Sequence, residues 1–252
     1  MSPLGNQEAI DWKRQCVAVI PCFNEAAQIG AVVAQVQRHL PKVIVVDDGS
    51  TDATADQARS AGAEIIRFSK NHGKGNALQA GWRRAHELGF PWVIMLDGDG
   101  QHAADDLPKF FSQAEKNGCL LVVGNRMDDC VAMPPLRRQV NQWLSRRISR
   151  MTGAALPDSQ CGFRLAHLAT LLKLPIRANR FEIESAMLVA FCRAGCGIEF
   201  VPVQTIYQNT VSKINPLTDT FRWLRWRFAP NASGLCRSPV PPCGTVPWSS
   251  RS

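Results

Sequence analysis

The sequence predicts an α/β protein with a mostly parallel central sheet and helices on both faces. Two observations support this fold class. Short apolar runs alternate with segments of helical periodicity, a pattern typical of right-handed βαβ units. Polar clusters directly follow the apolar runs, and ligands of such sheets bind beyond the carboxyl ends of the strands. With 252 residues, 45% of them hydrophobic, the chain is long enough to bury one sizeable core.

Five apolar runs in the first half of the chain are expected to form buried strands. They are residues 16–21, 42–48, 63–68, 92–97 and 119–126. Helices are expected between them, at residues 25–40, 50–62 and 73–89, and a further one capped by Asp105 or Asp106. Pro41, Gly62 and Gly89 provide the stop signals for the first three helices.

The second half of the chain is less regular. A loop leading into a short helix is expected at 159–165, a helix at 181–194, a strand at 197–203 and another short helix at 217–228. The residues after Ala229 are rich in Pro, Ser, Gly and Cys without periodicity, which predicts a disordered tail. The expected organisation is an N-terminal extension over 1–14, a catalytic domain over 15–228 and the tail over 229–252.

Composition narrows the classes of protein that fit. The nine cysteines show no CxxC pair, which argues against a disulfide scaffold or a zinc ribbon and favours reduced thiols in a cytosolic protein. The first 15 residues contain no apolar run typical of a signal peptide. No segment reaches the roughly 20 apolar residues that span a bilayer. We therefore expect a cytoplasmic location.

The sharpest chemical feature is the pair Asp97 and Asp99, separated only by Gly98, at the end of the fourth expected strand. Carboxylates two residues apart on a strand share a face, and glycine allows the chain to bend until both reach one point. Two such charges repel unless a cation joins them. Oxygen ligands favour Mg²⁺ or Mn²⁺, which proteins hold with one or two carboxylates and substrate phosphates. A surface turn with helix-capping acids is the alternative.

Two more clusters suggest contacts with a nucleotide. Asp47 and Asp48 end the second expected strand, where a carboxylate can accept hydrogen bonds from a base or a ribose; helix capping explains Ser50 to Asp52 but not the two consecutive acids. The segment "GKGN" lacks the third glycine of a dinucleotide fingerprint, and no P-loop motif is present. A tight turn into a helix is favoured for this segment over a supplementary phosphate contact by Lys74.

At this point the ordered motifs resemble a known family. "VIPCFNE", "VVDDGSTD", "NHGKGNAL", "MLDGDGQH", "VVGNR", "SQCGFR" and "SKI" follow one another in the order found in family 2 glycosyltransferases with the GT-A fold. Within that family the chain is most similar to the dolichol-phosphate mannosyltransferase-like branch, the polyprenyl-phosphate sugar synthases. The resemblance covers about residues 15–228. It implies an inverting, metal-dependent hexosyltransferase that moves a sugar from a GDP- or UDP-linked donor to a membrane-associated acceptor, most simply a polyprenyl phosphate.

The resemblance also implies roles for individual residues. Pro21, Phe23 and Glu25 would line the nucleoside pocket, and Val46 and Asp48 would contact the base and ribose. Asp97, Gly98 and Asp99 would hold the diphosphate through Mg²⁺ or Mn²⁺, with Asp97 and Asp99 as the metal carboxylates and Asp99 as the direct ligand. Gln101 would lie near the donor sugar or the acceptor, and Arg126 and Lys213 would face phosphates of acceptor and donor.

The nature of the acceptor decides whether a general base is needed. A phosphate oxygen is already ionised at neutral pH, whereas a hydroxyl requires a carboxylate base, for which Glu182 and Glu184 are the candidates unless they are only helix charges. A hydroxyl acceptor on a glycolipid or glycan therefore stays open as an alternative. An inactive homologue that binds nucleotide-sugars without turnover is a second alternative.

Basic and aromatic residues gather in two segments of the second half. Residues 135–151 carry five arginines on an amphipathic pattern, and 221–228 reads "FRWLRWRF". Such composition suits the headgroup level of a bilayer, although the first segment also suits an ordinary helix packed on the sheet. Single-stranded nucleic acid would use similar residues, but the strand-end carboxylates would repel a phosphate backbone. We expect peripheral contact with the cytoplasmic face of a membrane and no nucleic acid partner.

Overall fold

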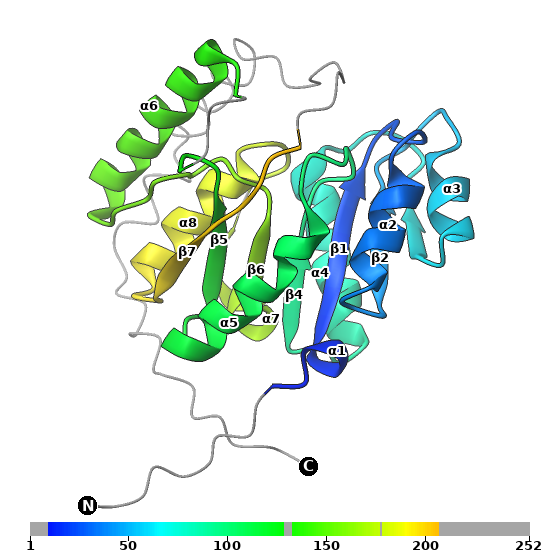
Figure 1. Ribbon diagram of the computed structural model, residues 1–252, viewed down its shortest axis with the longest axis horizontal. Helices are drawn as coiled ribbons and strands as arrows, with labels where there is room; N and C mark the ends of the chain where they lie inside the picture. Colours follow the sequence, from blue (N-terminus) through cyan, green and yellow to red (C-terminus); the bar gives the residue numbers. More distant parts are fainter. Residues whose placement is uncertain (1–9, 129–132, 177, 207–252) are drawn as a thin grey trace, which may run out of the picture.

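A computed structural model describes residues 10–128, 133–176 and 178–206 (Figure 1). Its centre is a seven-stranded sheet in the order β3-β2-β1-β4-β6-β5-β7. The strands are β1 (Cys16–Cys22), β2 (Val43–Asp47), β3 (Glu64–Arg67), β4 (Trp92–Met95), β5 (Leu121–Asn125), β6 (Arg164–His167) and β7 (Ile198–Pro202). Every neighbouring pair is parallel except the two pairs that β6 makes, with β4 and with β5. The mostly parallel sheet predicted from the sequence is confirmed.

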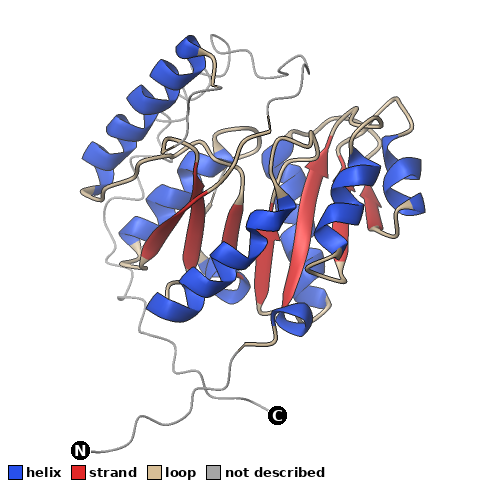
Figure 2. Ribbon diagram, viewed as in Figure 1, coloured by secondary structure: helices blue, strands red, loops and turns tan. Residues whose placement is uncertain are grey.

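Helices cover both faces of this sheet (Figure 2). One face carries α2 (Ile29–Gln37), α3 (Thr54–Ser60) and α5 (Leu107–Asn117), and the other carries α4 (Lys74–Glu87), α7 (Leu168–Lys173) and α8 (Ile183–Arg193). The short α1 (Trp12–Gln15) lies at the start of β1, and the 3-10 turn η1 (Ala104–Asp106) precedes α5. The longest helix of the described ranges, α6 (Pro135–Thr152), lies beyond the carboxyl ends of the parallel strands and packs on α8.

The central strands are apolar on both faces because helices cover both. Residues Cys16 to Ile20 of β1 are fully buried, and no residue from Val43 to Asp47 of β2 is more than 1% exposed. The register places Pro21 beside Val46 and Cys22 beside Asp47, so the polar loops after these strands leave the sheet side by side. The packing of the core therefore brings the loop clusters of separate βαβ units to one edge.

One sequence expectation is wrong. The segment 159–165 was expected to be a loop leading into a short helix, but strand β6 begins at Arg164 before α7 starts. Arg164 is almost fully buried, and its guanidinium donates to the carbonyl oxygens of Ser159, Cys161 and Glu184. A charged residue that begins a four-residue strand hides the apolar pattern by which buried strands are recognised.

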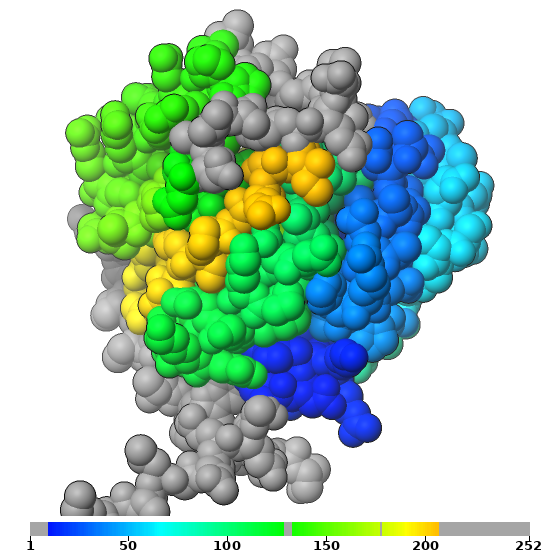
Figure 3. Space-filling model, in the orientation of Figure 1, coloured from blue at the N-terminus to red at the C-terminus, as the bar shows by residue number. Residues whose placement is uncertain are grey.

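The last described residues return to the strand-end loops. β7 runs beside α5 across the face seen in Figure 3. Beyond it, Ile206 donates its N–H to the carbonyl oxygen of Gln101 at 2.9 Å, and Thr205 forms an isolated bridge with His102. This pairing fixes the loop after β4 from a second side.

The following sequence expectations fall outside the described residues: Lys213, the short helix at 217–228, the basic-aromatic segment 221–228 and the tail 229–252. The expected extension 1–14 is described only from residue 10 onward. Within the described ranges, no helix combines the length and the apolar character required to cross a membrane.

Candidate active site

The positive partner of Asp97 in this structure is Lys74, the first residue of α4. Its ammonium group lies 2.5 Å from Asp97 Oδ1 and 2.6 Å from Glu184 Oε1 on α8. His102 Nε2 lies 3.6 Å from the other oxygen of Asp97. One lysine thus bridges two carboxylates that come from different elements. The sequence predicts repulsion between Asp97 and Asp99. At Asp97 this repulsion is reduced by the ammonium group of Lys74.

Both partners of this pair stay charged at neutral pH. Burial by itself raises the pKa of Asp97, but the Lys74 ammonium and His102 outweigh it and hold that pKa well below its usual range. Burial lowers the pKa of Lys74, yet Asp97 and Glu184 together raise it above its usual value. Glu184 Oε2 is buried and accepts no hydrogen bond from the described residues. Lys74 is therefore the counter-charge for an otherwise acidic corner of the site.

Two glycines let the chain close around this cluster. A Cβ at Gly98 would lie 2.4 Å from Cys22 Sγ, so only glycine allows the loop after β4 to pass against β1. A Cβ at Gly162, in the "SQCGFR" motif, would lie 2.8 Å from Asp97 Oδ2 and 3.0 Å from Lys74 Nζ. The sequence indicated a bend at Gly98; in the structure its missing side chain is required by close packing.

Asp99 lies apart from the lysine pair and is partly exposed. Its Oδ1 accepts the backbone N–H of Gln101 at 3.0 Å, and its Oδ2 accepts no hydrogen bond from the described residues. The side chain of Gln101 reaches Arg137 of α6, at 3.5 Å from its Oε1. Asp99 therefore presents one available carboxylate oxygen at the carboxyl end of β4, beside the start of α6.

This donor set fits a divalent cation held mainly by its substrate. In the described ranges, no three His, Cys, Asp or Glu side chains converge into a metal-ligand group. Mg²⁺ and Mn²⁺ sites of phosphate-transfer chemistry need only one or two carboxylates, and the phosphates and water complete the shell. Asp99 supplies such an oxygen, whereas Asp97 is engaged by Lys74 in this structure.

The residues expected around the nucleoside lie on the loops after β1 and β2. Pro21 and Val46 are neighbours in the sheet, with Val46 fully buried, and Phe23 is exposed at the edge. Thr54 Oγ1 accepts the backbone N–H of Glu25 at 2.8 Å, and Ser50 Oγ accepts that of Asn24 at 2.9 Å. These bonds join the two loops. Of the expected capping residues, Asp52 accepts the backbone N–H of Thr54, the first residue of α3, at 3.0 Å, while the N-cap position itself is Ala53.

The two consecutive acids after β2 hold different parts of the site. Asp47 Oδ1 accepts the N–H of Ser50 at 2.8 Å, and Arg67 lies 3.2 Å from Asp47 Oδ2. Asp48 is buried and accepts the N–H groups of His72 and Gly73 at 2.7 and 2.8 Å. Gly73, with φ +96°, is the N-cap of α4. Asp48 thereby anchors the turn from which Lys74 projects toward Asp97.

Arg126, just after β5, is buried and paired with the fully buried Asp158. Its Nε and Nη2 atoms donate to the two oxygens of Asp158 at 2.8 and 3.0 Å, and its backbone N–H donates at 3.1 Å. Asn141 of α6 donates to the same carboxylate at 3.0 Å. This network ties α6 to the loop after β5. Burial raises the pKa of Asp158, but Arg126 and the hydrogen bonds outweigh it and hold the pKa at about 2.

The Asp158 pair predicts a specific loss of stability in acid. The pKa of Asp158 is about 2 in the folded protein, against an ordinary value of 3.8. The ionised carboxylate therefore makes its full contribution to stability at pH values above 3.8. That stability is lost as pH falls through the folded value, by about 2 kcal/mol between roughly pH 4 and pH 2. Urea unfolding across this range should show a shallower pH dependence for Asp158→Asn than for the wild type. Identical slopes would contradict this assignment.

Several residues of this site were missed or given minor roles by the sequence. Asp158 carries no recognisable signal, and Gly162 and His102 stand in motifs of the family resemblance without a role assigned to them. A phosphate contact is the less favoured role of Lys74 in the sequence, and Glu184 is one of two candidate bases. The structure brings Lys74, Glu184, His102 and Gly162 around Asp97, and leaves Glu182 bonded to the N–H groups of Asn179 and Arg180.

Comparison with known sequences gives a consistent picture. The family described as glycosyl transferase family 2 matches residues 17–174. The UDP-N-acetylglucosamine–dolichyl-phosphate N-acetylglucosaminyltransferase of Methanococcus voltae is 31% identical over 212 residues, covering 75% of this chain and 84% of that protein. The undecaprenyl-phosphate mannosyltransferase of Micrococcus luteus is 28% identical over 200 residues, covering 74% of this chain and 82% of that protein.

Comparison with solved structures supports the fold. Glucosyl-3-phosphoglycerate synthase from Mycobacterium tuberculosis, in complex with Mn²⁺, UDP and phosphoglyceric acid, superimposes with a TM-score of 0.68. The alignment covers 88% of this chain and 78% of that chain, at 21% sequence identity. At this identity the likeness concerns the architecture alone, and it agrees with the GT-A fold expected from the sequence.

Proposed function

Since this chain belongs to glycosyl transferase family 2, and to its polyprenyl-phosphate sugar synthase branch, we propose that it transfers a sugar from a nucleoside-diphosphate donor to a polyprenyl phosphate. One observation carries the proposal. The loop after β4 presents Asp99 with an available carboxylate oxygen, two residues after an Asp97 that is paired with Lys74. Lys74 offsets one of the two negative charges of Asp97 and Glu184, and a cation that arrives with the diphosphate would offset the charge of Asp99.

The reaction requires that the negative charge on the departing nucleoside diphosphate be stabilised. The bond between the sugar's anomeric carbon and the diphosphate breaks, and the electron pair leaves with the nucleoside diphosphate. A bound Mg²⁺ or Mn²⁺, held by Asp99, would neutralise the negative charge that develops on the leaving diphosphate oxygen. Lys74 contributes a fixed positive charge at the same corner, which costs no reorganisation during the reaction. Phe23, Glu25 and Asp48 are proposed to contact the nucleoside, as the family resemblance implies.

The chemistry of a phosphate acceptor explains why no free base is required. One of its oxygens, already ionised, attacks the anomeric carbon from the face opposite the diphosphate and inverts the configuration. Glu184, the better-placed of the two candidate bases, is occupied by Lys74 at 2.6 Å. Gln101 lies on the loop after β4, next to Arg137 of α6, and we assign it to the acceptor side. Arg126, which the resemblance places at the acceptor, is buried against Asp158 and holds the loop after β5 instead. The exposed apolar and basic residues of α6 suit peripheral contact with a membrane that carries the acceptor.

The acceptor assignment is tested by comparing a polyprenyl phosphate with the matching polyprenol. The purified full chain is incubated with UDP- or GDP-linked sugars and Mn²⁺, and the products are identified by mass spectrometry. A thermal-shift panel first selects the donor nucleotide, because a bound ligand raises the unfolding temperature. We expect a polyprenyl-phosphate sugar from the phosphate and no product from the alcohol. Equal transfer to the alcohol would contradict the proposal and favour a hydroxyl acceptor.

A further inference from the structure

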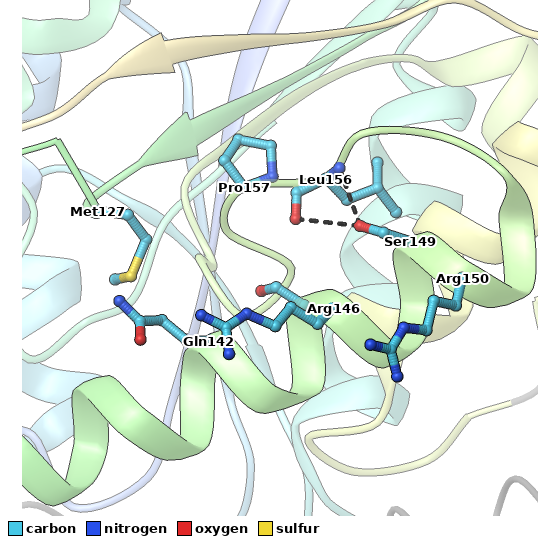
Figure 4. A pocket seen from close by; sticks show the side chains of 8 residues that line it. Met127, Gln142, Arg146, Ser149, Arg150, Leu156 and Pro157 are labelled. Atoms are coloured by element: carbon cyan, nitrogen blue, oxygen red, sulfur yellow. Dashed lines mark hydrogen bonds between the residues drawn. The ribbon is translucent and has the colours of Figure 1, made fainter.

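A pocket of about 440 Å³ lies between α6 and the segments around Met127 and Pro157 (Figure 4). Arg146 and Arg150 project from successive turns of α6 and form one side of it. Met127, Leu156 and Pro157 give the other wall an apolar character. A space with two guanidinium groups and an apolar wall suits a ligand that carries both an anion and hydrocarbon.

The charge of the pocket is not compensated by the described protein. None of its lining residues is acidic, and α6 contains five arginines but no Asp or Glu. Neither Arg146 nor Arg150 forms a hydrogen bond or an ion pair with a described residue. The adjacent Asp158 is already used by Arg126 and Asn141. Guanidinium groups bind phosphate with paired donors, so a phosphate is the matching anion.

Hydrogen bonds hold the walls of the pocket in place. Ser149 Oγ accepts the N–H of Leu156 at 3.1 Å and donates to the Leu156 carbonyl oxygen at 3.5 Å (Figure 4). Ser145 Oγ accepts the N–H of Ser159 at 2.9 Å, one turn earlier on α6. The pocket is therefore formed before any ligand binds, and binding does not have to order its walls.

The pocket is too far along α6 to hold the phosphate that attacks the sugar. The acceptor end of α6 is marked by Arg137, which contacts Gln101. Arg146 and Arg150 lie nine and thirteen residues further, which at 1.5 Å per residue is about 14 and 20 Å. A reacting oxygen must come within about 3.5 Å of its carbon. A phosphate held in the pocket would consequently be a different one.

The same helix carries exposed apolar residues of the kind that suit a bilayer surface. Leu136, Trp143 and Met151 are 62%, 43% and 38% exposed, and the guanidinium carbon of Arg147 lies 5.9 Å from the Trp143 ring centroid. Aromatic and basic residues interleaved in this way favour the headgroup region. We propose that the pocket between α6 and Pro157 binds the phosphate of an anionic membrane lipid other than the acceptor, and so docks α6 on the bilayer.

Binding of the full chain to vesicles tests this site without any sugar transfer. Vesicles of phosphatidylcholine with phosphatidylglycerol are compared with vesicles of phosphatidylcholine alone. The wild type should bind the anionic vesicles more tightly, and Arg146→Gln/Arg150→Gln should weaken that binding about 30-fold, from two lost arginine contacts. Transfer to a water-soluble, short-chain prenyl phosphate should stay within about twofold. Failure of the transfer reaction would therefore leave the vesicle result standing.

Two further variants separate a built phosphate site from general attraction of positive charge. Arg146→Lys/Arg150→Lys keeps the charge but loses the paired donors, and should still weaken binding at least about tenfold. Arg138→Gln removes an exposed arginine of α6 outside the pocket and should cost no more than about fivefold. Wild-type binding by the lysine variant would overturn the proposal. Tight binding of glycerol 1-phosphate without vesicle binding would also overturn it, because the phosphate would then be a soluble one.

Discussion

Asp99→Ala is expected to lower the rate of sugar transfer about 10³-fold or more. The variant removes the carboxylate oxygen that we assign to the divalent cation, and such a cation contributes several kcal/mol to stabilising a leaving oxygen. The N–H of Gln101 also loses its acceptor, so the loop after β4 is less well held. Initial rates at saturating donor and acceptor, measured with Mn²⁺, check this expectation.

Asp99→Asn and Asp105→Ala are the matched controls for that variant. Asparagine keeps an oxygen for the N–H of Gln101 but is a poor ligand for Mg²⁺ or Mn²⁺, so its activity should stay close to that of Asp99→Ala. Asp105 is an exposed carboxylate in the same loop region, paired only with His39 in the described protein, and its loss should change the rate less than about twofold. If Asp99→Asn kept a tenth of the wild-type rate or more, Asp99 would not be the metal ligand.

Lys74→Met is expected to lower kcat/KM for the donor at least about 100-fold. Without the ammonium group, Asp97 and the buried Glu184 lose their common counter-charge, and breaking a buried ion pair costs about 3–5 kcal/mol. The acidic corner then repels the donor diphosphate as well. Donor affinity by calorimetry, kcat/KM and thermal unfolding should all be measured, because both stability and binding are expected to fall.

Two companion variants separate the role of Lys74 in the site from its role in the fold. Lys70→Met removes an exposed lysine four residues earlier and should leave activity within about twofold. Lys74→Met/Glu184→Gln also removes the negative charge on α8, and should recover at least half of the lost stability without recovering turnover. If Lys74→Met retained donor affinity and kcat/KM within fivefold, Lys74 would be only a structural cation.

Glu184→Gln alone tests the rival role of that residue. It leaves the contact between Lys74 and Asp97 intact, so transfer to a phosphate acceptor should fall less than about tenfold. A loss near that of Asp99→Ala would identify Glu184 as a general base instead, and would favour a hydroxyl acceptor.

The parts of the fold that the sequence predicted well are those in which the local pattern and the tertiary environment agree. β1 and β2 are continuous apolar runs because helices cover both faces of the sheet, and the acids after them lie at its carboxyl edge as expected. The same reasoning placed Asp97 and Asp99 correctly at the end of β4. Periodicity and strand-end polarity are both short-range signals, and they are sufficient here.

The features that the sequence could not predict depend on contacts between distant segments. Arg126 and Asp158 are 32 residues apart, and Lys74 meets Glu184 from a different helix on the same face of the sheet. The sequence indicated a missing positive charge beside Asp97 and Asp99 and assigned it to a cation. In the structure Lys74 is shared between Asp97 and Glu184, and Asp99 is the carboxylate that we propose for a metal. Strand β6 is not predicted because it begins with a charged residue, Arg164. Arg164 can be buried only because distant backbone carbonyl oxygens accept its hydrogen bonds, and the sequence pattern does not reveal them.

Metal dependence of the transfer rate tests the central claim most directly. The full chain is stripped with EDTA, supplied with its nucleotide-sugar donor and a polyprenyl phosphate, and assayed while Mn²⁺ or Mg²⁺ is added back. The account predicts no transfer in EDTA, a rate that rises and saturates with the added ion, and no such recovery in Asp99→Ala. Equal transfer with and without EDTA, in the wild type and in Asp99→Ala alike, would contradict it.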